Sequence, residues 1–190
     1  MEFLPDVTAE SEEGLAEAIA EPVILEAYDP TWPRQFADER DRLGTALPGR
    51  FLAIEHFGST AVAGLPAKRV IDMLAGLSTL DDAASLIDPL RALGYHYPSG
   101  FNATLCERRW LMRQHRGRRT HHLHLVVFDG APWRRELRVR DVLRANPAIA
   151  AQYAAHKRAL AATHGGDREA YTRGKGQFIA DVLRAGATLR

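Results

Sequence analysis

HFGSTAVAGLPAKRVID, residues 56–72, is the stretch that decides the fold of this chain. An apolar strand ends at the Gly58-Ser59 turn, and a connection punctuated by glycine and proline leads to a second strand that carries Asp72. A Gly-Ser turn frees backbone N–H groups and a hydroxyl to hold a phosphate. A carboxylate on the next strand can face that phosphate and carry a divalent cation. The stretch therefore predicts a pocket for a phosphorylated ligand and a metal ion.

The composition favours one buried core. The chain has 190 residues, 46% of them hydrophobic, which predicts one domain or a domain with a helical appendage. The 25 Lys and Arg against 24 Asp and Glu give no reason to expect bulk binding to nucleic acid or an acidic membrane. Cys106 is the single cysteine, which excludes an intramolecular disulfide. No apolar run reaches the roughly 20 residues that span a bilayer, and residues 1–21 are acidic where a signal peptide is basic, so we expect a cytoplasmic protein.

The apolar pattern predicts an α+β fold, with a small mixed β-sheet flanked by helices and a C-terminal helical segment. Strands are expected at residues 23–27, 51–57, 69–77, 95–97, 104–114 and 120–128. Helices are expected at residues 33–47, 80–93, 133–146, 148–163 and 168–189. This divides the chain into an acidic extension, residues 1–21, and one domain, residues 22–190, with a sheet core at about 22–130 and a helical tail at about 131–190.

Asp72 lies in an otherwise apolar strand, where a carboxylate is costly to bury unless it is paired or binds a metal. It is either a metal ligand and catalytic group, or a strand-end residue that faces solvent or pairs with arginine. Lys68, nine residues after Ser59, could contact a phosphate as a point charge. Enzymes that transfer nucleotidyl groups usually place two carboxylates at alternate positions of such a strand to hold two Mg²⁺ ions. Here the second position is Leu74, so the usual two-metal mechanism lacks one of its carboxylates.

Two histidines, His122 and His124, share one face of a later strand because one residue separates them. Two imidazoles in this spacing can ligate one metal, or one can act as a base while the other binds phosphate. The alternative is a surface cluster at the start of a strand. We predict that both join Asp72 as metal ligands and replace the missing carboxylate, with Asp72 and His124 as the catalytic groups. The divalent metal is Mg²⁺, Mn²⁺ or Zn²⁺, and imidazole ligands favour the last two.

Arginines are concentrated in the hairpin between the last two expected strands, around a loop at residues 115–119. If Arg109, Leu111 and Arg113 alternate on one face, Arg113 could face the same pocket as His122 and bind phosphate. The alternative is a solvated hairpin tip, above all for the arginines nearest the loop. The hairpin lacks the interleaved aromatic residues of an RNA-stacking platform, so nucleic acid is an unexpected partner.

The helical tail carries two tyrosine–lysine pairs in the i, i+4 spacing of one helix face: Tyr153 with Lys157, and Tyr171 with Lys175. The simpler interpretation is that the lysine stems pack on the tyrosine rings at the surface. In the other interpretation, Lys157 and Lys175 turn toward the sheet and close a pocket for a polyanion.

These motifs together resemble the GrpB family over residues 23–183. The similar segments are YDP-x-W at 28–32, HFGSTAV at 56–62, GLPAK at 64–68, ID at 71–72, H-x-H at 122–124 and RD at 140–141, with the tyrosine–lysine pairs of the tail. The resemblance implies a nucleotidyltransferase-like fold. Related domains also occur fused after dephospho-CoA kinase, which hints at a role in nucleotide or coenzyme A metabolism. The reaction of the family itself is poorly defined.

Three functions are compatible with these residues. The first is a nucleotidyltransferase-like protein that binds a nucleotide or another phosphorylated small molecule with a divalent metal, and transfers a nucleotidyl group. The second is a non-catalytic nucleotide-binding or accessory module, which the absent second carboxylate favours. The third is a protein-interaction scaffold. The phosphate-binding residues are predicted to be Gly58, Ser59, Thr60, Lys68, Arg113, Lys157 and Lys175. The sequence leaves the oligomeric state open.

Overall fold

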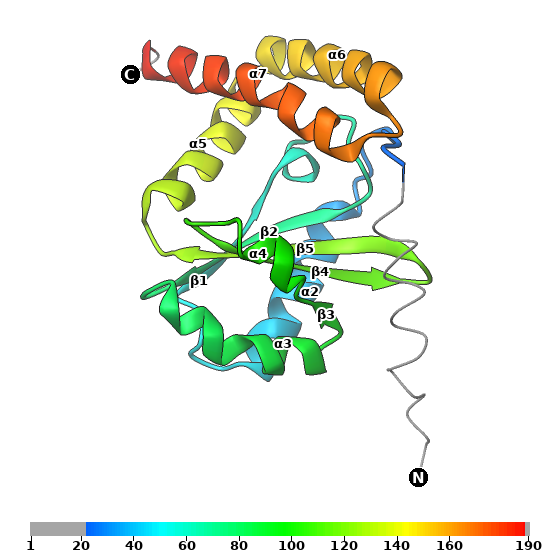
Figure 1. Cartoon of the computed structure of the whole chain (residues 1–190). Helices are drawn as coiled ribbons and strands as arrows, with labels where there is room; N and C mark the ends of the chain where they lie inside the picture. Colours follow the sequence, from blue (N-terminus) through cyan, green and yellow to red (C-terminus); the bar gives the residue numbers. More distant parts are fainter. Residues whose placement is uncertain (1–21, 189–190) are drawn as a thin grey trace.

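A computed structural model describes residues 22–188, so the acidic extension at residues 1–21 lies outside the described residues. One five-stranded sheet forms the centre, in the order β1-β2-β5-β4-β3 (Figure 1). The strands are β1 (Ala53–Phe57), β2 (Ile71–Leu77), β3 (Tyr95–His96), β4 (Arg109–His115) and β5 (Arg118–Val127). The neighbours β2 and β5 run parallel and the other pairs run antiparallel, which confirms the predicted mixed sheet.

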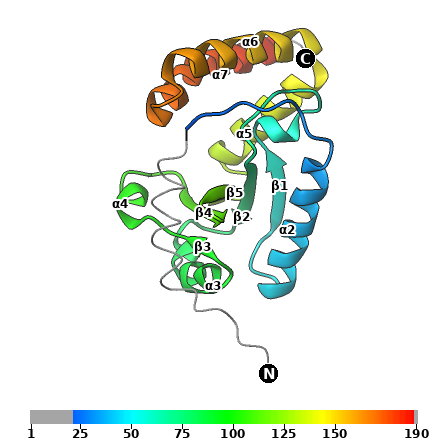
Figure 2. The same cartoon turned by 90° about the vertical axis from the view of Figure 1, so that its right-hand side faces the viewer.

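Helices cover both faces of this sheet (Figures 1 and 2). One face carries α2 (Trp32–Ala46), the 3₁₀ segment η2 (Asp81–Leu86) and α3 (Ile87–Ala92). The helical tail covers the other face with α5 (Ala131–Ala145), α6 (Pro147–His164) and α7 (Arg168–Thr188). Two short elements, η1 (Ser59–Ala61) and α4 (Ser99–Asn102), lie in the connections. None of the described helices is long and apolar enough to cross a membrane.

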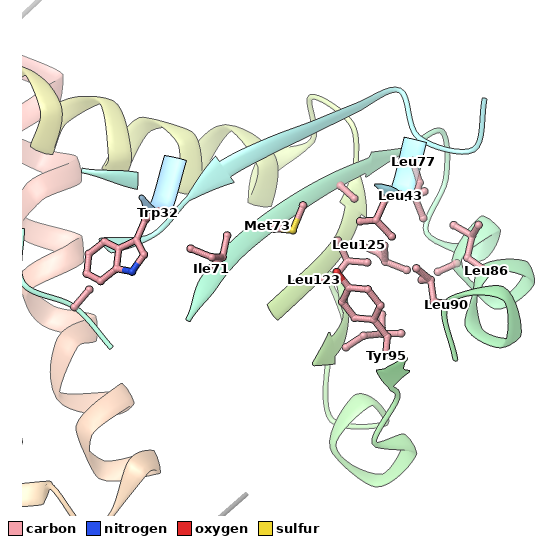
Figure 3. Packing of buried hydrophobic residues seen from close by; sticks show 14 residues of the cluster. Trp32, Leu43, Ile71, Met73, Leu77, Leu86, Leu90, Tyr95, Leu123 and Leu125 are labelled. Atoms are coloured by element: carbon pink, nitrogen blue, oxygen red, sulfur yellow. The ribbon is translucent and has the colours of Figure 1, made fainter. Parts of the chain in front are cut away.

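The main hydrophobic core lies between the sheet and the helices α2 and α3 (Figure 3). Alternate residues of β2 and β5 point into it because side chains of a strand alternate between its two faces. The fully buried members include Trp32, Leu43, Ile71, Met73, Leu77, Leu86, Leu90, Tyr95, Leu111, Leu123 and Leu125. Each such side chain contributes about 1.5–3 kcal/mol relative to leaving it in water.

The opposite face of the sheet changes from apolar to polar along β2 and β5. Trp133 of α5 packs on Leu74 and Val126, and also on Phe57, the cross-strand partner of Asp72. The polar end begins beside Phe57, where Asp72 stands opposite His122 in place of an apolar residue. The connection between β1 and β2 packs on the tail through a separate cluster, made of Val62, Leu65, Leu143, Tyr153, Ala154 and Val182. The tail and this connection therefore enclose the polar end of the face.

Three predicted elements differ in the structure. The strand expected at residues 104–114 begins only at Arg109. The strand expected at residues 23–27 is wrong: a single bridge joins Glu26 to Ala67, and the preceding Pro66 has no N–H to extend the pairing. The helix expected at residues 80–93 is split into η2 and α3. Pro89 explains the split, because its ring would clash with the carbonyl of residue 85 in a continuous α-helix, whereas it fits the first turn of α3.

Candidate functional site

The Gly58-Ser59 turn brings the connection between β1 and β2 against Asp72. Gly58 has a φ of 72°, and a Cβ added there would lie 2.7 Å from Asp72 Oδ2. Glycine alone permits both this backbone conformation and so close an approach. The turn that follows is tied to the tail, because Arg144 donates from Nε to the carbonyl oxygen of Ala61 at 2.8 Å. The fold thus holds the turn and the carboxylate together.

Asp72, His122 and His124, hereafter the Asp-His-His cluster, come together on one face of the sheet. In the parallel pair β2·β5, Asp72 is opposite His122 and Leu74 is opposite His124, so all four side chains share a face. Nδ1 of His122 lies 2.9 Å from Oδ1 of Asp72. One ligand atom from each cluster residue lies within 4.8 Å of the other two. The pairing of β2 with β5, which alternation within each strand does not determine, thus brings together the three residues predicted as metal ligands.

The electrostatics of the cluster make Asp72 anionic and both histidines neutral at pH 7. Burial alone would raise the pKa of the Asp72 carboxyl, but the hydrogen bond and charge of His122, with His124 and Lys68, hold it well below its usual range. Burial lowers the pKa of His122 despite its bond to Asp72. Burial and the charge of Arg108 lower the pKa of His124 to about 3.

A divalent cation fits this arrangement. Neutral His122 donates its Nδ1–H to ionised Asp72, which leaves the lone pair on Nε2. That Nε2 is buried and has no hydrogen-bond partner among the described residues. A carboxylate that fixes the tautomer of a metal-binding imidazole is a common feature of protein metal sites. Two imidazoles and a carboxylate suit Zn²⁺ or Mn²⁺ better than Mg²⁺.

Both predicted interpretations of the tail lysines hold in part. The Nζ atoms of Lys157 and Lys175 lie 4.9 Å from the ring centres of Tyr153 and Tyr171, so each stem packs on its tyrosine as the simpler interpretation expects. Yet Lys157 is 1% exposed and donates from Nζ to the carbonyl oxygen of Pro66. It therefore faces the connection that carries the Gly-Ser turn, not the surface.

The lysines concentrate positive charge beside Asp72. Burial, and then the charge of Lys175, lower the pKa of Lys157 to about 7, and Lys68 and Asp72 also act on this group. Nζ of Lys68 lies 5.8 Å from the ring centre of Tyr171, so it reaches the same part of the tail as Lys175. An anion bound among these groups would favour the charged form of Lys157.

The hydroxyls of the turn have different roles. Burial raises the pKa of Tyr153 and Ser59 acts to lower it, so Ser59 lies near the tyrosine–lysine pair of α6. The hydroxyl of Thr60, a residue predicted to bind phosphate, has partners within the protein. Thr60 is buried, and its hydroxyl lies 3.0 Å from Nε2 of His56 and donates to the carbonyl oxygen of Val70 at 3.4 Å. Thr60 therefore stabilises the connection internally.

Arg113 is also placed differently from the prediction. It pairs with His121 across the β4·β5 ladder, so it lies on the face opposite His122. There Nη1 of Arg113 donates to Oε2 of Glu39 at 2.8 Å, and Arg42 and Tyr95 bind the same buried carboxylate. Arg109, Leu111 and Arg113 do share a face, but its polar residues form a structural ion pair network and not the candidate site.

A family model described as GrpB protein matches residues 22–185. The chain belongs to the GrpB family. It is 42% identical over 158 residues to the protein PA4798 of Pseudomonas aeruginosa, covering 82% of this chain and 64% of that protein. A dephospho-CoA kinase of Mycolicibacterium paratuberculosis is 34% identical, over 86% of this chain and 46% of the kinase. The chain thus spans less than two thirds of either relative.

A crystal structure of the conserved protein GrpB from Enterococcus faecalis has a similar fold. Its TM-score is 0.77 at 35% identity, and the match covers 86% of this chain and 96% of that one. The likeness extends over nearly the whole solved chain, so this chain and that GrpB protein share one fold.

Three residues beside the cluster of this GrpB-family chain escaped the sequence analysis. Arg108 acts on the pKa of His124, and Trp110 stacks near His122 with ring centres 5.1 Å apart. Arg119, expected at a solvated tip, lies with its guanidinium carbon 5.7 Å from the Trp110 ring centre. A bulge between Arg113 and Gln114 pairs Gln114 with Arg119, which turns Arg119 to the face of Trp110. A one-residue bulge leaves no clear trace in the sequence pattern.

Proposed function

We propose that this GrpB-family protein binds a phosphorylated small molecule through a divalent cation held by the Asp-His-His cluster. The observation that carries the proposal is the grouping of one ionised carboxylate and two neutral imidazoles within 4.8 Å, one of them with an unpartnered buried nitrogen among the described residues. Buried polar groups are costly unless they are satisfied, so a ligand that satisfies them stabilises the protein. When bound, a divalent cation supplies positive charge to phosphate oxygens.

The surrounding residues have complementary roles in this proposal. Lys68, Lys157 and Lys175 would neutralise the charge of the phosphates, and Lys157 already donates a hydrogen bond to the carbonyl oxygen of Pro66. Gly58 keeps the turn close enough to Asp72 for turn and cation to act on the same ligand. The position two residues after Asp72 is Leu74, which is buried and apolar. This observation favours binding over the two-metal transfer of a nucleotidyl group.

A second candidate, an accessory module related to coenzyme A or nucleotide metabolism, is favoured by the match to part of a dephospho-CoA kinase. It uses the same pocket without turnover. Transfer of a nucleotidyl group is the stronger form of the proposal, and release of pyrophosphate from nucleoside triphosphates tests it. Under that form Asp72→Asn abolishes release, whereas an accessory module shows no release at all.

Calorimetry and thermal unfolding test the binding itself. Mn²⁺ or Zn²⁺ at 100 times its dissociation constant should add about 2.7 kcal/mol to the stability of the protein. Asp72→Asn and His124→Ala should remove this effect. Asp88→Asn, which changes an exposed carboxylate paired with Arg91, should leave it intact. A metal shift that survives both cluster variants would show that the cation binds elsewhere.

A further inference from the structure

Trp110 extends the candidate site along the sheet. It pairs with His124 across β4 and β5, so its side chain lies on the face of the Asp-His-His cluster. Its ring centre is 5.1 Å from that of His122, with 60° between the planes. The guanidinium carbon of Arg119 lies 5.7 Å from the Trp110 ring centre. An aromatic ring and a guanidinium group therefore adjoin the cluster.

Phe101 completes this group from the short helix α4. Its ring is edge-on to Trp110, with centres 5.4 Å apart and planes at 82°. The side chain is exposed, at 47%, and neither Phe101 nor Trp110 belongs to a hydrophobic cluster of the described core. An exposed phenylalanine on a half-buried tryptophan, beside a cluster of polar residues, suggests a surface that binds a ligand.

A buried amide holds these rings in place. Asn102 is 3% exposed, and its Nδ2 donates to the carbonyl oxygens of Pro98 at 3.0 Å and Trp110 at 2.8 Å. Its Oδ1 accepts from the Trp110 backbone N–H at 2.7 Å. These bonds fix α4 against the start of β4 and leave Phe101 little freedom. Such preorganisation lowers the entropy lost when a ligand binds.

We propose that Phe101, Trp110 and Arg119 form the subsite for the base of a nucleoside phosphate, whose phosphates bind at the Asp-His-His cluster and the tail lysines. The inference rests on the proposed function and narrows its ligand from phosphorylated small molecules to nucleotides. Aromatic rings and guanidinium planes stack on any base because every base has a π-face. A simple sugar phosphate offers no planar group to this surface.

Calorimetry with ATP and with tripolyphosphate, each with Mn²⁺, tests the inference because only ATP carries a base. The wild type should bind ATP about tenfold more tightly than tripolyphosphate. Phe101→Ala should lower the affinity for ATP about tenfold and leave the affinity for tripolyphosphate unchanged. Leu52→Ala is the matched control, since Leu52 is an exposed hydrophobic residue before β1, at the end of that strand far from Phe57 and its partner Asp72. It should change neither affinity.

Tryptophan fluorescence gives a second, direct readout. Trp32 is fully buried and Trp133 is 6% exposed, so a stacked base should quench mainly Trp110. ATP should quench the tryptophan fluorescence of the wild type, and tripolyphosphate should not. Trp110→Phe should lose this quenching but keep its affinity for ATP within about threefold, because phenylalanine still offers a ring.

The failures are distinguishable. If ATP and tripolyphosphate bind the wild type equally and Phe101→Ala changes neither, the base subsite is wrong while the proposed phosphate and metal binding stands. If neither compound binds the wild type with Mn²⁺ or Zn²⁺, the proposed function itself is overturned, and the subsite with it. Circular dichroism of each variant confirms that the fold is retained.

Discussion

Replacing Lys157 with methionine should stabilise the fold near neutral pH, because it removes a buried ammonium group. Burial and the charges of Lys175 and Arg158 lower the pKa of Lys157 from 10.5 to about 7. Between these two values the unfolded chain holds a proton that the folded chain lacks, so the free energy of unfolding rises with pH. Below pH 7 both states are protonated, and the full destabilisation remains.

The expected size follows from the same values. Moving a pKa from 10.5 to about 7 corresponds to roughly 5 kcal/mol of destabilisation below pH 7. The methionine variant also leaves the Pro66 carbonyl oxygen without its donor, at a cost of about 1–3 kcal/mol. We therefore expect Lys157→Met to be roughly 2–4 kcal/mol more stable than the wild type below pH 7. Near pH 10, where the wild-type lysine is neutral, the order should reverse.

Urea unfolding at a series of pH values measures this difference. Above pH 7, the free energy of unfolding of the wild type should rise by about 1.4 kcal/mol per pH unit relative to that of the variant. The series ends at about pH 10, because above that pH Tyr171, with a pKa raised by burial to about 12, and Tyr153 titrate in the unfolded chain. Arg158→Met removes a neighbouring exposed charge and should change stability by less than about 0.5 kcal/mol. Parallel pH profiles for wild type and Lys157→Met would refute the reasoning.

Three further outcomes are expected. Gly58→Ala should abolish metal binding, because its Cβ would lie 2.7 Å from Asp72 Oδ2. Gly64→Ala, also at positive φ but with open space around it, should only destabilise the fold by about 1–3 kcal/mol. Equal metal affinities of the two variants in calorimetry would contradict this. Glu39→Gln should cost about 3–5 kcal/mol in urea unfolding without changing metal affinity; a loss under about 1 kcal/mol would show that the buried ion pairs contribute little. Asn102→Ala should raise hydrogen exchange at residues 99–110, and unchanged protection would mean that the amide does not hold α4.

The part of the site that the sequence predicts correctly depends on alternation along single strands and on the fold that the family resemblance implies. His122 and His124 share a face because strand side chains repeat every two residues. Asp72 joins them because an isolated carboxylate in an apolar strand needs a partner, and His122 supplies it at 2.9 Å. The shared face of the two histidines follows from one strand alone, whereas their place beside Asp72 was inferred from the resemblance to a nucleotidyltransferase-like fold.

The errors arise where pairing between strands decides the outcome. Arg113 was assigned to the face of His122, but the face of β4 relative to β5 depends on the hairpin connection. Arg116 and Gly117 form a tight turn with positive φ, where a five-residue loop was expected. The bulge then shifts the register beyond Arg113 by one residue, which moves Arg119 to the other face. Register is a tertiary property, so alternation within one strand did not determine it.

The two carboxylates on the opposite faces of the sheet, Glu39 and Asp72, show why one belongs to a structural network and the other to a candidate site. Glu39 is saturated: its carboxylate accepts hydrogen bonds from Arg42, Tyr95 and Arg113. The unpartnered Nε2 of His121 on that face shows that an unsatisfied nitrogen alone does not identify a site. At Asp72 one carboxylate stands among two neutral imidazoles and three lysines, one of them with a pKa lowered to about 7. This excess of positive charge is costly without an anion, and a phosphorylated ligand with its cation relieves it.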